Sequence, residues 1–253
     1  MKINCLKHLT IVIFLGTFLS VEAQSGVFHE VGFGVGPVSF RGDWGERGDT
    51  RTNLGNTGFG VNISHHVNYA YTRNAHKYFN KHFKMRNSLV LHQTALNHYG
   101  RWQAGNSLGA LQLQNMSGRS TVIELGSGLE WFWKEIRDFE REIKTFQPYA
   151  GAGLNLVYFN PRVETSLPGD IGSVDNTFPT FLGRTTNSSR LTLSANFQGG
   201  TRYRLNPDVD LFIEGRWHFF MSDYVDGLNP LNPNNRSNDW VFFLNFGFTY
   251  YFE

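Results

Sequence analysis

Apolar and polar residues alternate with period two along most of this chain, over stretches longer than the roughly 5–6 residues of an ordinary strand. Successive side chains of a β-strand point to opposite faces, so strict alternation predicts strands with one apolar and one polar face. Seven segments show this alternation clearly: residues 30–36, 58–69, 122–133, 149–156, 191–204, 209–218 and 242–252. An eighth strand is expected near 83–99, although Leu89 and Leu91 fall on the opposite face from Val90 and Leu96.

The lengths of the connections predict how these strands are joined. Long polar connections follow the first, third, fifth and seventh strands, and shorter ones follow the others. The long ones are residues 41–57, 100–120, 160–189 and 222–238, and the short ones are 72–82, 134–144 and 205–208. This layout predicts an all-β fold: an eight-stranded antiparallel transmembrane β-barrel with long extracellular loops, short periplasmic turns and both termini in the periplasm.

Aromatic residues near the strand ends favour a membrane setting for the apolar face. Tyr69, Trp131, Phe219 and Trp240 stand where the aromatic girdles of membrane barrels meet the lipid interface. Outer-membrane lipid is then the expected partner of that face. A soluble sandwich or a lipocalin-like barrel stays open as an alternative, because alternation alone does not distinguish contact with lipid from burial in a core.

The N-terminal segment has the three parts of a secretory signal peptide. Lys2 and Lys7 precede an apolar stretch over residues 9–19, and Ala23 precedes the expected cleavage site. The apolar stretch is shorter than the ~20 residues of a membrane-spanning helix. We therefore expect residues 1–23 to be a cleaved signal peptide, and residues 24–253 to be one exported β-barrel domain in the outer membrane.

Charged residues occupy the polar face of the strands, so they would fill the inside of the barrel. An eight-stranded barrel is just wide enough for side chains to fill it, and an unpaired charge there is costly. We expect the acids and arginines to form ion pairs that leave no continuous pore. The expected interior charge network consists of Glu30, Glu124, Glu130, Glu214, Arg202, Arg204 and Arg216, with Asp210 and His218 on the same face.

The residue patterns do not predict binding of nucleic acid, nucleotides or metal ions. The formal net charge of +2 argues against nucleic-acid binding through phosphate contacts. The glycine series from Gly32 to Gly36 lies within a strand rather than at a turn that opens a helix, so no nucleotide site is predicted. His65 and His66 point to opposite faces and cannot share a metal ion. We therefore expect no cofactor and no metal ion, and we identify no small-molecule substrate.

A serine paired with a histidine is the remaining enzymatic possibility. Some outer-membrane barrels are lipid hydrolases, and Ser64 or Ser88 with His66 or His92 would supply the two groups. The sequence contains no Gly-x-Ser-x-Gly motif, and no third group can be assigned to orient a histidine. The chain is therefore expected not to be an enzyme, and a lipid-modifying activity is the least favoured hypothesis.

Residues 134–144 form the densest run of charges in the chain. Because their signs alternate, a solvated turn is the favoured prediction. Ile136, Phe139 and Ile143 have helical spacing, so the alternative is a short amphipathic helix that docks onto a periplasmic partner. The turn is preferred because isolated short helices are marginal in water.

Short motifs stand around the ends of the predicted strands. They are residues 29–32, 40–43, 148–153, 158–161, 199–206 and 220–226. Gly42 and Asp43 follow the first strand, and Asp223, Tyr224 and Asp226 follow the seventh. In their order and spacing, these motifs resemble those of the small PorG-like outer-membrane β-barrels associated with the type IX secretion system of Bacteroidetes. The chain departs from that pattern at residues 73–86 and 227–238.

The resemblance implies a barrel that contacts periplasmic rings of the secretion and gliding motor and has no catalytic residues. We therefore expect a non-enzymatic anchor or scaffold in a protein secretion apparatus, with periplasmic secretion-motor proteins as its partners. The alternative is an autonomous outer-membrane barrel that binds a surface ligand through its extracellular loops, residues 100–120 and 160–189.

Overall fold

The structure is a computed structural model, and it describes residues 26–46, 48–230 and 238–252. The predicted signal peptide of residues 1–23, with its cleavage site after Ala23, lies outside the described residues. Within the described part of the chain, none of the helices has the length and apolar character needed to cross a lipid bilayer.

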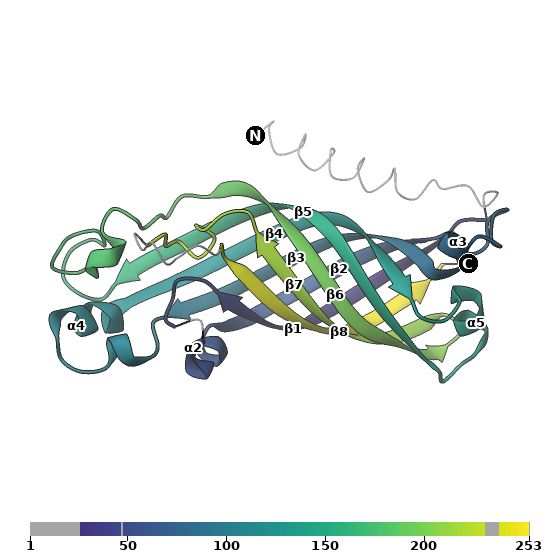
Figure 1. Cartoon of the computed structure of the whole chain (residues 1–253), viewed down its shortest axis with the longest axis horizontal. Helices are drawn as coiled ribbons and strands as arrows, with labels where there is room; N and C mark the ends of the chain where they lie inside the picture. The colour runs from purple at the N-terminus through teal and green to yellow at the C-terminus, as the bar shows by residue number, and fades with distance from the viewer. Residues whose placement is uncertain (1–25, 47, 231–237, 253) are drawn as a thin grey trace, which may run out of the picture.

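Eight antiparallel strands close into a single barrel (Figure 1). Each strand pairs with the next one in the sequence, and β1 pairs with β8 to close the ring. The strands are β1 (Phe28–Arg41), β2 (Thr57–Asn68), β3 (Phe83–Asn97), β4 (Met116–Phe132), β5 (Phe146–Thr165), β6 (Arg190–Asn206), β7 (Val209–Phe220) and β8 (Trp240–Tyr251). The predicted eight-stranded antiparallel β-barrel is confirmed.

The apolar face of the strands points outward and the polar face points inward. On β2, for example, Phe59 and Ile63 are exposed, whereas Asn62, Ser64 and His66 are buried. Aromatic pairs lie on the outer surface near both ends of the barrel, such as Phe146 with Tyr203 and Phe219 with Trp240. A belt of exposed apolar side chains bounded by aromatic residues is the surface of a membrane-spanning barrel.

Strand β3 shows which face of the predicted strand at residues 83–99 lies inside the barrel. Leu89 and Leu91 are 45% and 47% exposed, while Val90 and Leu96 are each 1% exposed. The inward face also carries Lys84, Arg86 and His92, all buried. The strand therefore places apolar residues on both of its faces, which is why its alternation was difficult to interpret from the sequence.

Two strands extend several residues into segments that the sequence predicts as loops. Strand β4 begins at Met116 and β5 continues to Thr165, although residues 100–120 and 160–189 were predicted as loops. The two extensions pair with each other from Met116–Thr165 onward. Their outward positions are polar, and Arg119 and Arg162 are exposed there. These strand ends therefore have the reverse polarity of the membrane belt, which hid them from a search for apolar outward faces.

The inside of the barrel is apolar at the end from which β4 and β5 project, and the sequence analysis did not predict this apolar region. Buried side chains from six strands and the adjoining loops pack together there. We call this cluster the apolar plug. Its members are Val38, Phe40, Trp44, Val90, Leu96, Leu113, Met116, Val122, Val157, Phe159, Val163, Phe181, Phe220, Val225, Leu228, Val241 and Phe243. The plug fills one mouth of the barrel with closely packed apolar groups.

The two ends of the barrel differ in their connections (Figure 1). The long-loop end carries α2 (Thr50–Gly55), η1 (Arg101–Gln103), α4 (Leu108–Asn115) and η2 (Pro179–Phe181). The short-turn end carries α3 (Tyr78–His82), α5 (Ile136–Arg141) and the two-residue turn at 207–208, and the C-terminal end of β8 lies there too.

Helix α5 replaces the solvated turn that the sequence favoured for residues 134–144. Ile136 and Phe139 are 1% and 2% exposed, and Ile136 packs with Ala70, Phe132 and Tyr149 at the mouth of the barrel. Burial of these two side chains supplies the stabilisation that an isolated short helix lacks. The apolar face of α5 therefore covers the barrel itself, and these two residues are not available to dock a partner.

Candidate functional site

Charged side chains inside the barrel form one continuous series of ion pairs, which we call the charge chain. It runs in the order Glu140, Lys84, Glu30, Arg202, Glu130, Arg86, Glu214 and Arg216. Four carboxylates alternate with four cations, so the series is electrically neutral. Neutrality matters here because each of these charges would be costly to bury alone.

Arg202 and Arg86 are the two bridging cations of the charge chain. The Arg202 guanidinium lies 2.9 Å from Glu30 and 3.0 Å from Glu130. Arg86 lies 2.7 Å from Glu130 and 2.6 Å from Glu214. All five side chains are at most 5% exposed. Each arginine thus joins carboxylates on strands that are not neighbours in the barrel, β1 and β4 for Arg202 and β4 and β7 for Arg86, so the ion pairs cross the lumen.

The expected interior network lies inside the barrel, but not all of it belongs to the charge chain. Glu30, Glu130, Glu214, Arg202 and Arg216 do belong to it. The other four residues form two separate groups. Glu124 contacts His218 at 2.9 Å and accepts a hydrogen bond from Ser194. Arg204 forms an ion pair with Asp210 at 3.1 Å. Glu124 therefore contacts His218, which the sequence placed on the same face, and Ser194, which it did not include in the network.

Sequence reasoning missed three members of the charge chain. Lys84 and Arg86 lie on β3, which has apolar residues on both faces, and the sequence pattern marks residues 73–86 only as a departure from the family motifs. Glu140 belongs to the charge run that was expected to be solvated. It accepts from Lys84 at 3.0 Å and from Tyr71 at 2.7 Å. Lys84 and Arg86 lie even numbers of positions away from Val90, so they point to the same face of the strand. This spacing would have identified them as inward-facing once Val90 was placed inside.

The serine and histidine candidates for lipid hydrolysis all point into the barrel. Ser64, His66, Ser88 and His92 are each at most 8% exposed. A lipid ester outside the barrel could not reach them. His65 lies on the opposite face from His66, as predicted, and contacts His29 at 2.9 Å between ring nitrogens.

The family-like motif residues meet at the long-loop end. Asp43 follows β1, and its backbone N–H donates to a carboxylate oxygen of Asp226 at 2.6 Å. One oxygen from each of Asp43, Asp226 and Asp239 lies within 4.8 Å of the others. We call these three residues the acidic cluster. Burial and the neighbouring carboxylates raise the pKa of Asp226 and of Asp239 well above the usual range.

The other three motif residues surround this cluster. Gly42 lies against it: a Cβ at Gly42 would be 2.2 Å from Asp226 Oδ2. The charge of Asp223 also acts on Asp226. Tyr224 packs against the apolar plug, with the Arg190 guanidinium 4.8 Å from its ring centre. The sequence motif therefore corresponds to one structural unit that joins β1 to the β7–β8 connection.

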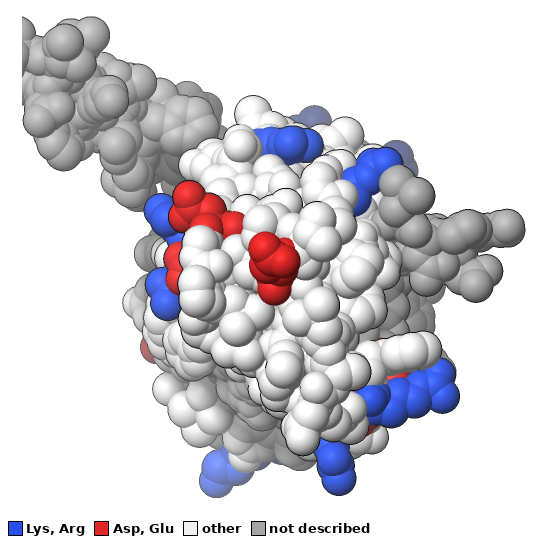
Figure 2. All heavy atoms as spheres, turned by 90° about the vertical axis from the view of Figure 1, so that its left-hand side faces the viewer, with Lys and Arg blue, Asp and Glu red and all other residues white. Residues whose placement is uncertain are grey.

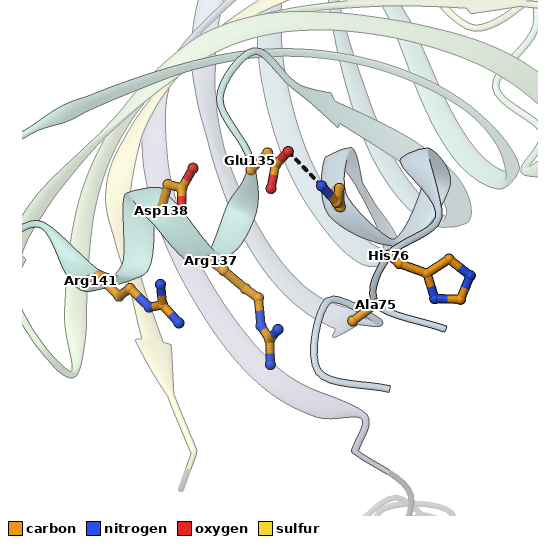
Figure 3. A pocket seen from close by; sticks show the side chains of 7 residues that line it. Ala75, His76, Glu135, Arg137, Asp138 and Arg141 are labelled. Carbon is orange, nitrogen blue, oxygen red and sulfur yellow. Dashed lines mark hydrogen bonds and ion pairs between the residues drawn. The ribbon is translucent and has the colours of Figure 1, made fainter. Parts of the chain in front are cut away.

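A charged cleft of about 300 Å³ lies at the short-turn end, between α5 and the β2–β3 connection (Figure 3). Lys81 donates to Glu135 at 2.8 Å, and this hydrogen bond lowers the pKa of Glu135. Arg141 and Asp138 are exposed at the cleft. Its lining consists of Ala75, His76, Lys81, Glu135, Arg137, Asp138 and Arg141. The cleft presents both signs of charge in a small area, which suits a polar protein surface.

Among the residues that the structure describes, the outer surface of the long-loop end is mostly uncharged (Figure 2). Lys and Arg side chains stand in small separate groups around it, and so do Asp and Glu side chains. A second cleft, of about 380 Å³, opens among the loops of this end. Its lining is Arg51, Tyr99, Gly100, Gln103, Ala104, Gly105 and Gln114.

No family model matches this chain, and no curated protein is similar to it in sequence. Among solved structures, Neisserial surface protein A is 15% identical, with a TM-score of 0.47, over 91% of this chain and 100% of that one. A major outer membrane protein from Thermus thermophilus is 12% identical, with a TM-score of 0.47, over 89% of this chain and 99% of that one.

Ail, the attachment invasion locus protein of Yersinia pestis, is also similar in fold. Its structure in complex with the heparin analogue sucrose octasulfate is 12% identical to this chain, with a TM-score of 0.42. The match covers 89% of this chain and 97% of Ail. These likenesses concern the fold alone. Judged by its own apolar belt, aromatic bands and charged interior, this chain is an outer-membrane-type β-barrel.

Proposed function

We propose that this protein is a sealed, non-conducting anchor in the outer membrane rather than a channel or an enzyme. The filling of the lumen carries this proposal. The apolar plug closes the barrel at the long-loop end, and the charge chain with α5 fills it toward the short-turn end. A solute would have to break both a packed apolar core and a neutral network of buried ion pairs.

Conductance across a planar lipid bilayer tests the seal. The full chain, refolded in detergent and inserted into the bilayer, should give no steady single-channel steps, and a general porin inserted under the same conditions gives the positive control. A variant in which Arg202 and Arg86 are both replaced with Ala should still give no steps, because the apolar plug closes the other end of the barrel independently of the ion pairs. Porin-sized steps from the unaltered protein would overturn the proposal.

We infer further that the anchor serves a secretion apparatus of the type IX kind, as the PorG-like motifs suggest. In this proposal the long-loop end faces the outside of the cell and the short-turn end faces the periplasm. The charged cleft between α5 and the β2–β3 connection would then meet a periplasmic secretion-motor protein. Its support is the motif unit around Asp43 and Asp226, together with the paired charges of the cleft.

A deletion strain gives the sharpest test of this role. Loss of the protein should reduce export of secreted cargo, and the unaltered gene should restore it. A charge-reversal variant, Arg141→Glu with Asp138→Lys, should weaken co-purification of a periplasmic partner while the barrel stays folded. The matched control is Asp175→Lys, because Asp175 is exposed at the other end of the barrel. Unchanged export in the deletion strain would exclude the secretion role.

Capture of a surface ligand is the second candidate function, and the cleft of about 380 Å³ among the long loops favours it. Arg51 and Gln114 would supply polar contacts, and Tyr99 would supply a flat apolar one. Replacing Arg51 and Gln114 with Ala should abolish cell-surface binding of such a ligand without any effect on secretion. Retained binding would exclude this cleft.

A further inference from the structure

The acidic cluster brings three separate chain segments to one point at the mouth of the barrel. Asp43 follows β1, Asp226 lies in the β7–β8 connection, and Asp239 immediately precedes β8. Asp226 and Asp239 are both 0% exposed. Carboxylates are rarely buried so completely unless a cation or several hydrogen-bond donors compensate them.

Backbone donors satisfy three of the four oxygens on the two fully buried acids. Asp43 N–H donates to Asp226 Oδ2 at 2.6 Å, and Leu228 N–H donates to Asp226 Oδ1 at 2.8 Å. Asp226 N–H donates to Asp239 Oδ2 at 3.0 Å. Asp239 Oδ1 is buried and has no hydrogen-bond donor among the residues that the structure describes.

The unsatisfied oxygen points into the cluster. A Cβ built on Gly42 would lie 2.2 Å from Asp226 Oδ2 and 2.7 Å from Asp239 Oδ1. Both oxygens therefore converge on the same place beside the Gly42 backbone. Any larger residue at position 42 would collide with them, so glycine is what lets the carboxylates approach the chain so closely.

The spacing of the oxygens fits a single hard cation. Ca²⁺ binds six to eight oxygens at about 2.3–2.6 Å, so two ligands of one ion lie at most about 5 Å apart. One carboxylate oxygen from each residue of the acidic cluster lies within 4.8 Å of the corresponding oxygens of the other two. All three donors are carboxylates, which favours Ca²⁺ over softer metals that select nitrogen or sulfur. Mg²⁺ demands a tighter octahedral arrangement and keeps more of its water.

We propose that Asp43, Asp226 and Asp239 form a Ca²⁺ site that fastens the β7–β8 connection to the end of β1. The ion would bind Asp239 Oδ1 and share Asp226 Oδ2, while water completes its coordination. Trp44 lies next to this site, since its indole N–H donates to the backbone carbonyl of Asp226 at 3.0 Å. Because Trp44 belongs to the apolar plug, the bound ion would stabilise the packing of the plug at the mouth of the barrel.

Terbium luminescence tests the site directly, because Tb³⁺ replaces Ca²⁺ at oxygen sites and emits when a nearby indole is excited. The full chain in a non-ionic detergent, stripped with EDTA, should bind Tb³⁺ with sensitised emission that Ca²⁺ displaces and Mg²⁺ displaces far less well. The same protein should show a higher thermal unfolding midpoint in Ca²⁺ than in EDTA, because an ion that binds only the folded state stabilises it.

Asp239→Asn keeps the shape of the side chain and removes the unsatisfied charge. It should lower the affinity for Ca²⁺ on the order of tenfold or more and remove the calcium-dependent rise in the unfolding midpoint. Asp175→Asn, at an exposed acid of the same end, should change neither. A gel-mobility assay of heated and unheated samples shows whether each variant is folded. Should Asp239→Asn not fold, Asp43→Asn serves in its place.

Two results would overturn the proposal. The first is an unaltered protein that shows no sensitised emission and no effect of Ca²⁺ on its unfolding, as expected if Asp226 and Asp239 merely share a proton. The second is a folded Asp239→Asn variant that binds Ca²⁺ as tightly as the unaltered protein.

Discussion

Arg86 on β3 donates to Glu214 on β7 at 2.6 Å, across the inside of the barrel. The same guanidinium nitrogen also contacts Glu130 at 2.7 Å. Replacing Arg86 with Met would leave two buried carboxylates short of a cation. We expect the free energy of unfolding to fall by about 3–5 kcal/mol, as it does when one partner of a buried ion pair is removed. Urea titration of the protein in phospholipid vesicles measures it.

The double variant Arg86→Met with Glu130→Gln separates charge from packing, because it leaves Arg202 paired with Glu30 and Arg216 paired with Glu214. It removes one acid together with the shared cation, so it should recover part of the stability that Arg86→Met loses. Equal losses in the single and double variants would show that Arg86 acts through its packing and not through its charge.

The apolar belt predicts that the cost of introducing an arginine on the outer face of β5, measured as the free energy of unfolding, depends strongly on its position along the strand. Leu156 is 51% exposed and pairs with Leu125 in the belt, whereas Glu164 lies on the projecting extension. Leu156→Arg should cost about 2–4 kcal/mol in a bilayer, because it places a charge in the hydrocarbon region. Glu164→Arg should change the free energy of unfolding by only a few tenths of a kcal/mol. Similar losses at both positions would contradict a membrane boundary between them.

The apolar plug predicts a large cost for a cavity at the mouth of the barrel. Phe159 on β5 is 0% exposed. Phe159→Ala should lower the free energy of unfolding by about 3–5 kcal/mol, because it removes buried area and leaves a cavity. Arg162→Ala, three residues further along the same strand on its exposed face, is the control and should have little effect. A small effect of Phe159→Ala would mean that the plug is loosely packed.

Most of the barrel could be predicted because its outer and inner faces obey one simple rule. Where lipid covers the outside, as at Ile63 and Leu125, the alternation of apolar and polar residues marks the strand directly. The rule fails at the long-loop end, because there water covers Arg162 and apolar side chains such as Val163 fill the inside. A strand with reversed polarity has the pattern of a loop when only apolar outward residues are sought.

The site residues divide in a similar way. Glu30 and Arg202 could be placed inside from their parity alone, and the motif pointed to Asp43 and Asp226. Asp239 could not be found this way, because it becomes part of the acidic cluster only when the β7–β8 connection folds back onto the end of β1. Contacts between loops distant in the sequence carry no periodic signal.

Acid should lower the free energy of unfolding through protonation of His98, whose side chain is 5% exposed at the long-loop end. The ring stacks on Trp44 and on Phe181, with ring centres 4.6 Å and 5.4 Å away, and its Nδ1 accepts from the backbone N–H of Gly45 at 3.1 Å. Burial lowers the pKa of His98 from 6.5 to about 3. Protonation of Nδ1 would end the hydrogen bond from Gly45 and place a charge between two aromatic rings.

The sign of the effect follows from where the proton binds. Below pH 6.5 the unfolded chain takes up a proton at His98 that the folded protein does not bind until the pH approaches about 3. The stability due to neutral His98 is therefore complete above pH 6.5, and it falls by about 1.4 kcal/mol per pH unit on acidification through that window. Urea midpoints measured at roughly pH 7.5, above the window, and at roughly pH 6 and 5, within it, give the slope.

His98→Asn should be less stable than the unaltered protein at pH 7.5 and should have a shallower slope, because asparagine can still accept from Gly45 but does not titrate. Other buried histidines contribute equally to both proteins and cancel in the difference. His76→Asn is the control, since His76 is exposed at the opposite end and should leave the slope unchanged. Parallel slopes for the unaltered protein and His98→Asn would show that the packing around His98 tolerates its charge.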